Sequence, residues 1–225
     1  MATIHQSPRR PRAERLIIFF TGWGMDEQQT GHLAADDDCD VWTVSDYSDP
    51  ARLLAIPGCY RSCTLVAWSL GVWAAAEAAP SLPPLDAAIA VNGTLHPVDE
   101  ANGIAPHIFN GTIDNWLDPR ARRRFLLRMT GSPEAAAAFL PPRRDPSSQQ
   151  RELQAIARRS IAAASGCNPF TCALVGGNDR IFPPAAQRHA WGLQPATRVV
   201  DFPAPHAPFA AFTRWSDFLR LADNA

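Results

Sequence analysis

The chain has 225 residues, a formal net charge of −1 and an apolar fraction of 46%. This length predicts one domain with a full hydrophobic core. The balanced charge excludes a general affinity for nucleic acid or for anionic membrane surfaces. All 21 basic residues are arginines. Because arginine binds carboxylates and phosphates bidentately, the places where arginines cluster carry information about partners.

The five cysteines follow no C-x-x-C pattern and no zinc-ligand spacing. We expect them to be reduced and mostly buried, in a cytoplasmic protein with no metal site. No apolar run is long enough to cross a membrane. Residues 1–14 are polar, contain arginine and proline, and lack the apolar core of a secretion signal, so we expect a loose N-terminal tail there.

The first half of the chain alternates buried apolar runs with loops and helical stretches. Expected strands lie at residues 15–20, 41–44, 64–68 and 86–91, and expected helices at 50–56 and from residue 70 to about 80. This alternation is typical of an α/β protein with a mainly parallel sheet.

The strand signal disappears between about residues 96 and 166. Helices are expected to start at Asp118-Pro119, Ser132-Pro133 and Ser147, where capping residues precede helix formers. Helices inserted between two strands of such a sheet predict a helical cap at about residues 96–166. From residue 118 to 160 ten arginines stand against four acids, a local excess of +6. This excess indicates either ordinary solvated helix faces or a docking surface for an acidic partner or substrate.

The sheet is expected to resume after the cap. The sequence predicts strands at residues 171–175 and 197–202 and a helix at 185–191 between them. An amphipathic helix is expected to close the chain, from about residue 209 to 222. The whole of residues 15–225 is therefore interpreted as one domain.

The stretch around Ser69 is typical of a nucleophile elbow, in which a strand turns sharply into a helix at a serine. The turn requires small flanking residues. Gly71 meets this requirement, and Ala67, at the position usually held by glycine, is still small. The helix N-terminus beneath the serine offers free N–H groups that suit a developing oxyanion. The alternative is a buried strand followed by Ser69 as an ordinary helix N-cap.

Two later strand ends supply the partners that a serine nucleophile needs, a base and an acid that orients the base. Asp179 follows the expected strand at 171–175, and His206 follows the last expected strand. Carboxyl ends of parallel strands are where such sheets bind ligands. Alone, Asp179 is a good turn residue and His206 an ordinary surface histidine. Together, in this chain order, the three residues predict a catalytic triad.

An oxyanion hole needs two N–H donors in fixed positions. We expect one from Leu70, which follows the nucleophile, and one from Trp23, which lies between two glycines after the first expected buried strand. The Trp23 side chain is expected to form a wall of the acyl pocket. Trp23, Leu70 and His206 are thus the expected substrate-binding residues. The chemistry requires neither a metal nor an organic cofactor.

Five segments carry a family resemblance. They are F-F-T-G-W-G-M-D (residues 19–26), A-W-S-L-G-V-W-A-A (67–75), N-G-T-L-H-P (92–97), G-G-N-D (176–179) and P-H-A-P-F (205–209). With them the sequence resembles the pimeloyl-[acyl-carrier protein] methyl ester esterases of biotin synthesis, compact α/β-hydrolases with a small cap. The similarity runs from about residue 15 to 220, and the cap matches only in character.

The resemblance implies an α/β-hydrolase fold with Ser69 as nucleophile, Asp179 as acid and His206 as base, and with the Trp23 and Leu70 amides in the oxyanion hole. It also implies that the substrate is a pimeloyl methyl ester on an acyl carrier protein, whose ω-carboxylate is freed by hydrolysis. Carrier recognition in this family resembles arginines docking on an acidic protein. The arginines expected to do so here are Arg122, Arg123, Arg128, Arg158 and Arg159.

Two other functions stay open at this point. A carboxylesterase or thioesterase for small soluble acyl substrates would use the same triad and would be indifferent to the charge of the cap. A hydrolase-like binding protein without catalysis is disfavoured by the intact triad. Haloalkane dehalogenase chemistry is disfavoured because it would need aspartate in place of Ser69.

Overall fold

The computed structural model describes residues 2–49, 59–162 and 167–223, so the helix expected at 50–56 lies outside the described residues. Within them, strands form one sheet in the order β1-β3-β2-β4-β5-β6-β7. The strands are β1 (Thr3–Gln6), β2 (Arg15–Phe20), β3 (Cys39–Ser45), β4 (Ser62–Trp68), β5 (Ala87–Val91), β6 (Cys172–Gly176) and β7 (Arg198–Phe202). Neighbouring strands are parallel except β1, which pairs antiparallel with β3.

The N-terminal residues join this sheet, which corrects the expectation of a loose tail. β1 places Ile4 opposite Val44 of β3, and the N–H of Ser7 donates to the Val41 carbonyl at 3.0 Å. Ala2 is buried. The segment T-I-H-Q has a single apolar residue, so its pattern gives no strand signal. The unpaired edge of β3, which this strand satisfies, is far away in sequence.

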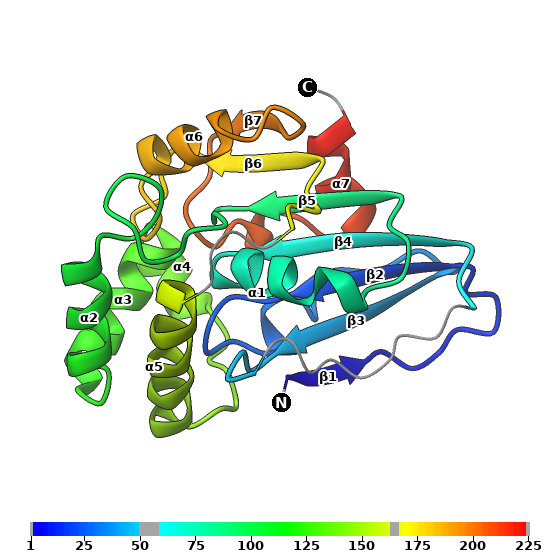
Figure 1. Ribbon diagram of the computed structural model, residues 1–225. Coiled ribbons are helices and arrows are strands. Elements are labelled where there is room, and N and C mark those ends of the chain that lie inside the picture. The colour runs from blue at the N-terminus through cyan, green and yellow to red at the C-terminus, as the bar shows by residue number, and fades with distance from the viewer. Residues whose placement is uncertain (1, 50–58, 163–166, 224–225) are drawn as a thin grey trace.

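Seven helices were found in the described residues. They are α1 (Leu70–Ala78), α2 (Pro106–Asn115), α3 (Pro119–Thr130), α4 (Pro133–Ala138), α5 (Pro146–Ala162), α6 (Pro184–Gly192) and α7 (Trp215–Asp223). Figure 1 shows α1 and α7 on opposite faces of the sheet. The sheet is therefore covered on both sides, as parallel sheets require.

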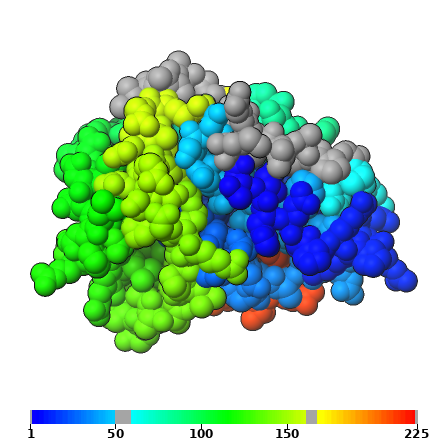
Figure 2. Space-filling view, turned by 90° about the horizontal axis from the view of Figure 1, so that it is seen from below, coloured from blue at the N-terminus to red at the C-terminus, as the bar shows by residue number. Residues whose placement is uncertain are grey.

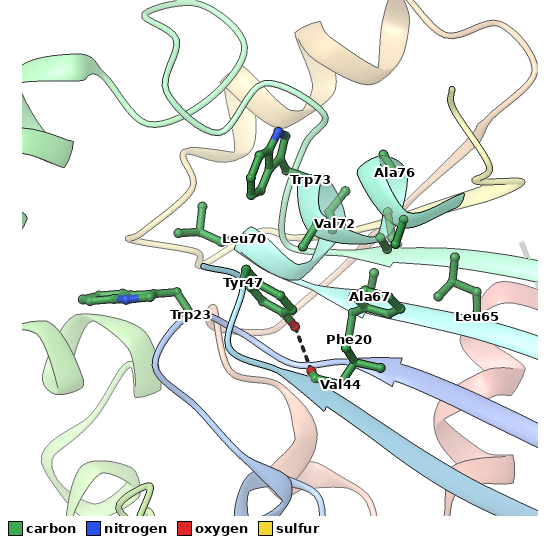
Figure 3. Close-up of a cluster of buried hydrophobic side chains, with 14 of the residues drawn as sticks. Phe20, Trp23, Val44, Tyr47, Leu65, Ala67, Leu70, Val72, Trp73 and Ala76 are labelled. Atoms are coloured by element: carbon green, nitrogen blue, oxygen red, sulfur yellow. Dashed lines mark hydrogen bonds between the residues drawn. The ribbon is translucent and has the colours of Figure 1, made fainter. Parts of the chain in front are cut away.

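Two hydrophobic clusters fill the two faces. On β2, Leu16, Ile18 and Phe20 belong to the cluster under α1, whereas Ile17 and Phe19 belong to the cluster under α7. Successive side chains of a strand point to opposite faces, so a strand buried on both faces is apolar throughout. Figure 3 shows the first cluster, with strand residues packed beneath α1. The apolar runs in the sequence follow from this double burial.

Helices α2–α5, hereafter the helical segment (residues 106–162), lie between β5 and β6 in the chain. They gather at the end of the sheet toward which the arrowheads of β5 and β6 point (Figure 1). The helical segment therefore lies over the carboxyl edge of the sheet. Figure 2 shows it as one end of the molecule, with the yellow-green residues of α5 beside light-blue residues that precede residue 50.

Two predicted helix starts in this segment are confirmed. The Asp118 carboxylate accepts a hydrogen bond from the Arg120 N–H, and the Ser132 hydroxyl accepts one from the Ala135 N–H. α5 begins at Pro146, one residue before the expected start. α2 was not predicted, because its N-cap position holds Ala105, whose side chain cannot cap a helix.

The end of the chain differs from the expected helix at 209–222. A short 3-10 turn, Phe209–Ala211, comes first, and α7 begins only at Trp215. Between them the chain is extended, and the Ala34 N–H donates to the Thr213 carbonyl at 2.8 Å. Pairing with a distant loop thus replaces the first turns of the helix.

All five cysteines are free, and Cys39, Cys63 and Cys172 are buried. Burial raises the pKa of each of these three thiols, that of Cys39 to about 11. Among the described residues, no helix combines the length and the apolar character needed to span a bilayer.

Candidate active site

Ser69 stands at a sharp turn between β4 and α1. Its φ of 59° and ψ of −129° are values that L-residues rarely adopt. A Cβ added at Gly71 would lie 2.4 Å from the Thr21 carbonyl oxygen and 2.6 Å from that of Phe20. The Ser69 hydroxyl makes no capping hydrogen bond to α1. The turn therefore has the geometry of an elbow, and the N-cap alternative is not supported.

His206 bridges Ser69 and Asp179. Its Nε2 lies 2.9 Å from Ser69 Oγ, and its Nδ1 lies 2.8 Å from Asp179 Oδ2. When Nδ1 carries the proton and donates to the carboxylate, Nε2 can accept the serine proton. The exposed fractions are only 6%, 5% and 1% for Ser69, Asp179 and His206. The structure thus brings together the three residues predicted from three separate strand ends.

The Asp179 carboxylate is held by four donors. Its Oδ1 accepts the N–H groups of Ile181 and Phe182 at 2.7 and 2.9 Å. Its Oδ2 accepts the Nε2 group of Gln187 at 3.0 Å in addition to His206. Gln187, on α6, is fully buried and also donates to the Phe182 carbonyl. Sequence reasoning missed Gln187, because a glutamine inside a helix gives no local signal of this role.

The backbone of His206 is fixed by two buried side chains. Trp68 Nε1 and Asn92 Nδ2 donate to the His206 carbonyl at 2.7 and 3.0 Å. Asn92 Oδ1 accepts the Gly176 N–H at 2.6 Å. Asn92 follows β5 with a φ of 48°. It therefore ties the end of β6 to the loop after β7, a role that its place in an N-G-T turn did not reveal.

The expected oxyanion donors lie beside Ser69. Trp23 and Leu70 both line the same pocket as Ser69. Within the part of the chain that the structure describes, neither backbone N–H donates a hydrogen bond. Figure 3 shows the Trp23 side chain pointing away from the strands and toward the helical segment. Its ring packs against Trp116 and Phe125, at centroid distances of 4.3 and 5.7 Å.

The loop that carries Trp23 is held by α5. Trp23 Nε1 donates to the Gln149 carbonyl at 2.7 Å, and Gln149 Nε2 donates to the Gly24 carbonyl at 2.9 Å. Glu152 Oε2 accepts the Gly24 N–H at 3.2 Å. Gly24 adopts a φ of 70°, which favours glycine. No local pattern in the sequence connects this loop with a helix more than 120 positions away.

Glu152 is the buried centre of this connection. Its side chain is fully buried, accepts the Tyr47 N–H at 2.7 Å, and lies 2.5 Å from the guanidinium of Arg144. Burial raises the pKa of the Glu152 carboxyl, although Arg144 opposes the shift. One side chain thus joins α5, the loop after β2 and the loop after β3.

A pocket opens at Ser69, and the space between its walls, including the part open to solvent, is about 450 Å³. Its other lining residues are mostly apolar and come from the sheet edge and the helical segment: Trp23, Leu70, Ile104, Ile108, Phe109, Thr112, Phe125, Arg128, Leu153, Arg180 and Ile181. Two of them are arginines and none is acidic. Such a pocket suits an acyl chain in a substrate that carries negative charge elsewhere.

The five arginines expected at a carrier surface differ in their surroundings. Arg122 donates to two backbone carbonyls near the start of α3, at 2.9 Å each. Arg159 forms an ion pair with Asp49 at 3.4 Å. The remaining three are exposed: Arg123, Arg128 and Arg158. Arg128 is the member of the five that lines the pocket at Ser69.

Solved structures show the same fold. The esterase RhEst1 from Rhodococcus sp. ECU1013 matches with a TM-score of 0.63 and 18% identity, over 99% of this chain and 92% of that chain. BioG from Haemophilus influenzae matches with a TM-score of 0.84 and 31% identity, over 96% of this chain and 98% of that one. The predicted α/β-hydrolase fold class is confirmed.

The sequence is also similar to part of a larger protein named for acyl carrier protein. A malonyl-[acyl-carrier protein] O-methyltransferase of Bacteroides fragilis is 38% identical over 184 residues, which are 80% of this chain and 37% of that protein. The chain therefore spans little more than a third of that relative. The sequence model of the family described as pimeloyl-ACP methyl esterase BioG matches residues 1–218. By this match over nearly its whole length, the chain belongs to the BioG family.

Proposed function

We propose that this protein is a serine esterase that hydrolyses the methyl ester of pimeloyl-[acyl-carrier protein] and frees the ω-carboxylate in biotin synthesis. The observation that carries the proposal is the position of His206, within hydrogen-bond distance of both Ser69 Oγ and Asp179 Oδ2. Membership of the BioG family supports the substrate. The free cysteines are consistent with an enzyme that acts in a reducing compartment such as the cytoplasm.

In the first half of the reaction, Ser69 Oγ attacks the ester carbonyl carbon while His206 Nε2 accepts the hydroxyl proton. Asp179 stabilises the imidazolium that forms. The backbone N–H groups of Trp23 and Leu70 donate to the oxyanion of the tetrahedral intermediate. When the intermediate collapses, the C–O bond to the methoxy group breaks, and His206 returns its proton so that methanol leaves.

In the second half, a water molecule replaces methanol. His206 accepts a proton from this water, whose oxygen attacks the acyl carbon of the ester with Ser69. Collapse of the second intermediate breaks the bond to Ser69 Oγ, which regains its proton from His206. The product is the free carboxylate on the carrier, and no cofactor takes part.

The helical segment acts in this proposal as a cap that covers the acyl chain and meets the acidic carrier protein. The exposed arginines of the expected set, Arg123, Arg128 and Arg158, make the charged contacts, whereas Arg122 and Arg159 contribute through the positive field of the surface. The similarity to part of a methyltransferase named for acyl carrier protein supports a carrier-bound methyl ester as substrate.

The test compares Ser69→Ala with wild type in hydrolysis of methyl pimeloyl-carrier protein. We expect turnover to fall by roughly 10⁴-fold or more, because the nucleophile is lost. Ser81→Ala, at an exposed serine after α1, is the control and should keep full activity. Wild-type turnover in soluble Ser69→Ala would contradict the proposed triad. In a biotin-requiring strain lacking its own esterase, growth should return with wild type and not with Ser69→Ala.

A second candidate is a carboxylesterase or thioesterase for small acyl substrates, which the mostly apolar lining of the pocket at Ser69 favours. It predicts equal kcat/KM for methyl pimeloyl-carrier protein and for a small methyl ester, and no response to reversal of the exposed arginine charges. The carrier-specific function predicts a large preference for the carrier-bound ester.

A further inference from the structure

Two surface hollows adjoin the pocket at Ser69. One, the α2–α3 groove of about 1000 Å³, shares Ile108, Thr112, Phe125 and Arg128 with the pocket. The other, the α6 hollow of about 680 Å³, shares Ile104, Ile108 and Ile181 with it. A bound substrate that is longer than the pocket can therefore extend from Ser69 into either hollow.

The two hollows carry opposite charge. The α2–α3 groove is lined by Arg124 and Arg128, and no acid is among its lining residues. The α6 hollow is lined by Glu100, and no basic residue is among its lining residues. An anionic substrate is attracted to the α2–α3 groove and repelled by the α6 hollow. Both hollows adjoin the pocket at Ser69, but their charges indicate that an anionic substrate extends into the α2–α3 groove.

The arginines of the α2–α3 groove are available to a ligand. Arg124 and Arg128 are both exposed, and within the described residues neither was found in an ion pair or hydrogen bond. The Arg128 guanidinium lies 6.0 Å from the centroid of the Phe125 ring, which packs on Trp23. Arg128 thus lies at the junction of pocket and groove, and Arg124, one helical turn earlier on the same helix, lies further out.

We infer that the α2–α3 groove binds the phosphate-bearing arm through which the acyl chain is attached to its carrier, and that Arg124 and Arg128 bind the phosphate. The inference rests on the proposed function, because only a carrier-linked ester has such an arm. The methyl ester lies at Ser69, the acyl chain fills the apolar pocket, and the arm leaves between α2 and α3. Arginine suits this role because its guanidinium binds phosphate oxygens bidentately.

This assignment moves Arg128 from the carrier-protein contacts of the proposed function to the phosphate of the arm. Arg124 was absent from the arginines expected from the sequence, and the groove adds it. Arg158 on α5 is exposed but lines neither hollow, so it remains a candidate for contact with the carrier protein itself. The arm is thus assigned to Arg124 and Arg128, and contact with the carrier protein to Arg123 and Arg158.

The experiment uses two protein-free substrates, the methyl pimeloyl thioesters of 4′-phosphopantetheine and of pantetheine, which differ only in the phosphate. The variants are Arg124→Ala, Arg128→Ala and the double substitution. Arg120→Ala is the matched control, because Arg120 is an exposed arginine of the same helix outside the groove. For the phosphorylated substrate we expect the double variant to raise KM about tenfold or more. For the pantetheine substrate the rise should be much smaller, and Arg120→Ala should change neither KM.

Three outcomes overturn the inference. The first is an equal rise in KM for both substrates, and the second is an equal effect of Arg120→Ala. The third is a phosphate-dependent effect of Arg180→Ala, in the pocket but outside the groove, without one from Arg124 or Arg128. Normal wild-type turnover with an unaffected double variant contradicts the groove and leaves the proposed function intact.

Failure of the proposed function is recognised separately. Wild type would then hydrolyse p-nitrophenyl butyrate but neither methyl pimeloyl thioester. The groove is still tested in that case, because 4′-phosphopantetheine should inhibit p-nitrophenyl butyrate hydrolysis in wild type and about tenfold more weakly in the double variant. Equal inhibition of both proteins would contradict the groove.

Discussion

The carboxyl edge of the sheet and the helical segment form opposite walls of one pocket, but different forces hold them. Ser69, Asp179 and His206 stand at the ends of β4, β6 and β7 and are almost fully buried. In the helical segment, α3 buries only Met129 and Thr130, and α4 buries none of its six residues. The sheet edge is therefore fixed by the core, whereas the position of the helical segment depends on a few specific contacts.

Those contacts concentrate at α5 and the connection before it. Gln149 and Glu152 bind the backbone of Gly24. The Arg143 N–H donates to Asp26 Oδ2 at 2.6 Å. All of these groups meet the loop after β2, next to Trp23. The helical segment is thus attached most firmly beside the proposed oxyanion hole, and its outer helices α3 and α4 are held less firmly.

The largest expected effect is at the elbow. Gly71→Val would place atoms against the Thr21 and Phe20 carbonyls, which belong to the core and cannot move apart. We expect a loss of several kcal/mol in the free energy of unfolding, of the size that overpacking and backbone strain produce. Thermal and denaturant unfolding followed by circular dichroism measure it.

The control for this change lies in the helical segment. Gly111, on α2, has no atom within 4 Å of an added Cβ. Gly111→Ala should therefore be tolerated or should stabilise its helix by up to about 1 kcal/mol. Equal destabilisation by Gly71→Val and Gly111→Ala would contradict the claim that the sheet edge is packed more tightly than the helical segment.

The next effect is at the contact between the walls. Glu152→Gln keeps the size of the side chain but brings an NH₂ group against the donors of Gly24, Tyr47 or Arg144. We expect the loop after β2 to shift and kcat to fall by roughly ten- to a hundredfold, since small misplacements of catalytic groups cost that much. Steady-state kinetics with a neutral ester measure it. Glu134→Gln, at an exposed glutamate of α4, should leave kcat unchanged.

Glu152 also gives a pH dependence with a defined sign. Burial raises the pKa of its carboxyl in the folded state above the ordinary value of 4.5. Between these two pKa values the folded state binds more protons than the unfolded state. The contribution of Glu152 to stability is therefore complete below about pH 4.5 and is lost as pH rises through the folded pKa. Glu152→Gln should flatten this part of the stability profile, and an unchanged profile would contradict the shift.

The same contrast explains which residues the sequence predicted. Ser69, Asp179 and His206 each follow an apolar run and stand in a turn rich in glycine or proline, so local pattern and chain order suffice to find them. Glu152 and Gln149 gain their roles from Gly24, far away in sequence, and nothing in α5 marks them. Such long-range pairings of ordinary polar residues have no local signal.

The fold shows a similar division. Strands buried on both faces were predicted to within two residues at each end, because double burial requires continuous apolar runs. β1 was missed, since it contributes one apolar residue to an edge that other strands create. The amphipathic pattern predicts helix from residue 209, whereas a 3-10 turn forms at 209–211 and pairing of Thr213 with Ala34 keeps the next residues extended. Packing between distant segments overrides local preference in both cases.

The smallest expected effect tests how loosely the outer helices are attached. Asp118→Ala removes the acceptor of the Arg120 N–H at the start of α3 and should cost about 1 kcal/mol. Because α3 buries so little, we expect this cost as local opening rather than as a lower global midpoint. Amide hydrogen exchange in the first turn of α3 should accelerate about fivefold, while exchange in β4 stays unchanged. A matched loss of protection in α3 and β4 would mean that the helical segment and the sheet edge unfold as one unit.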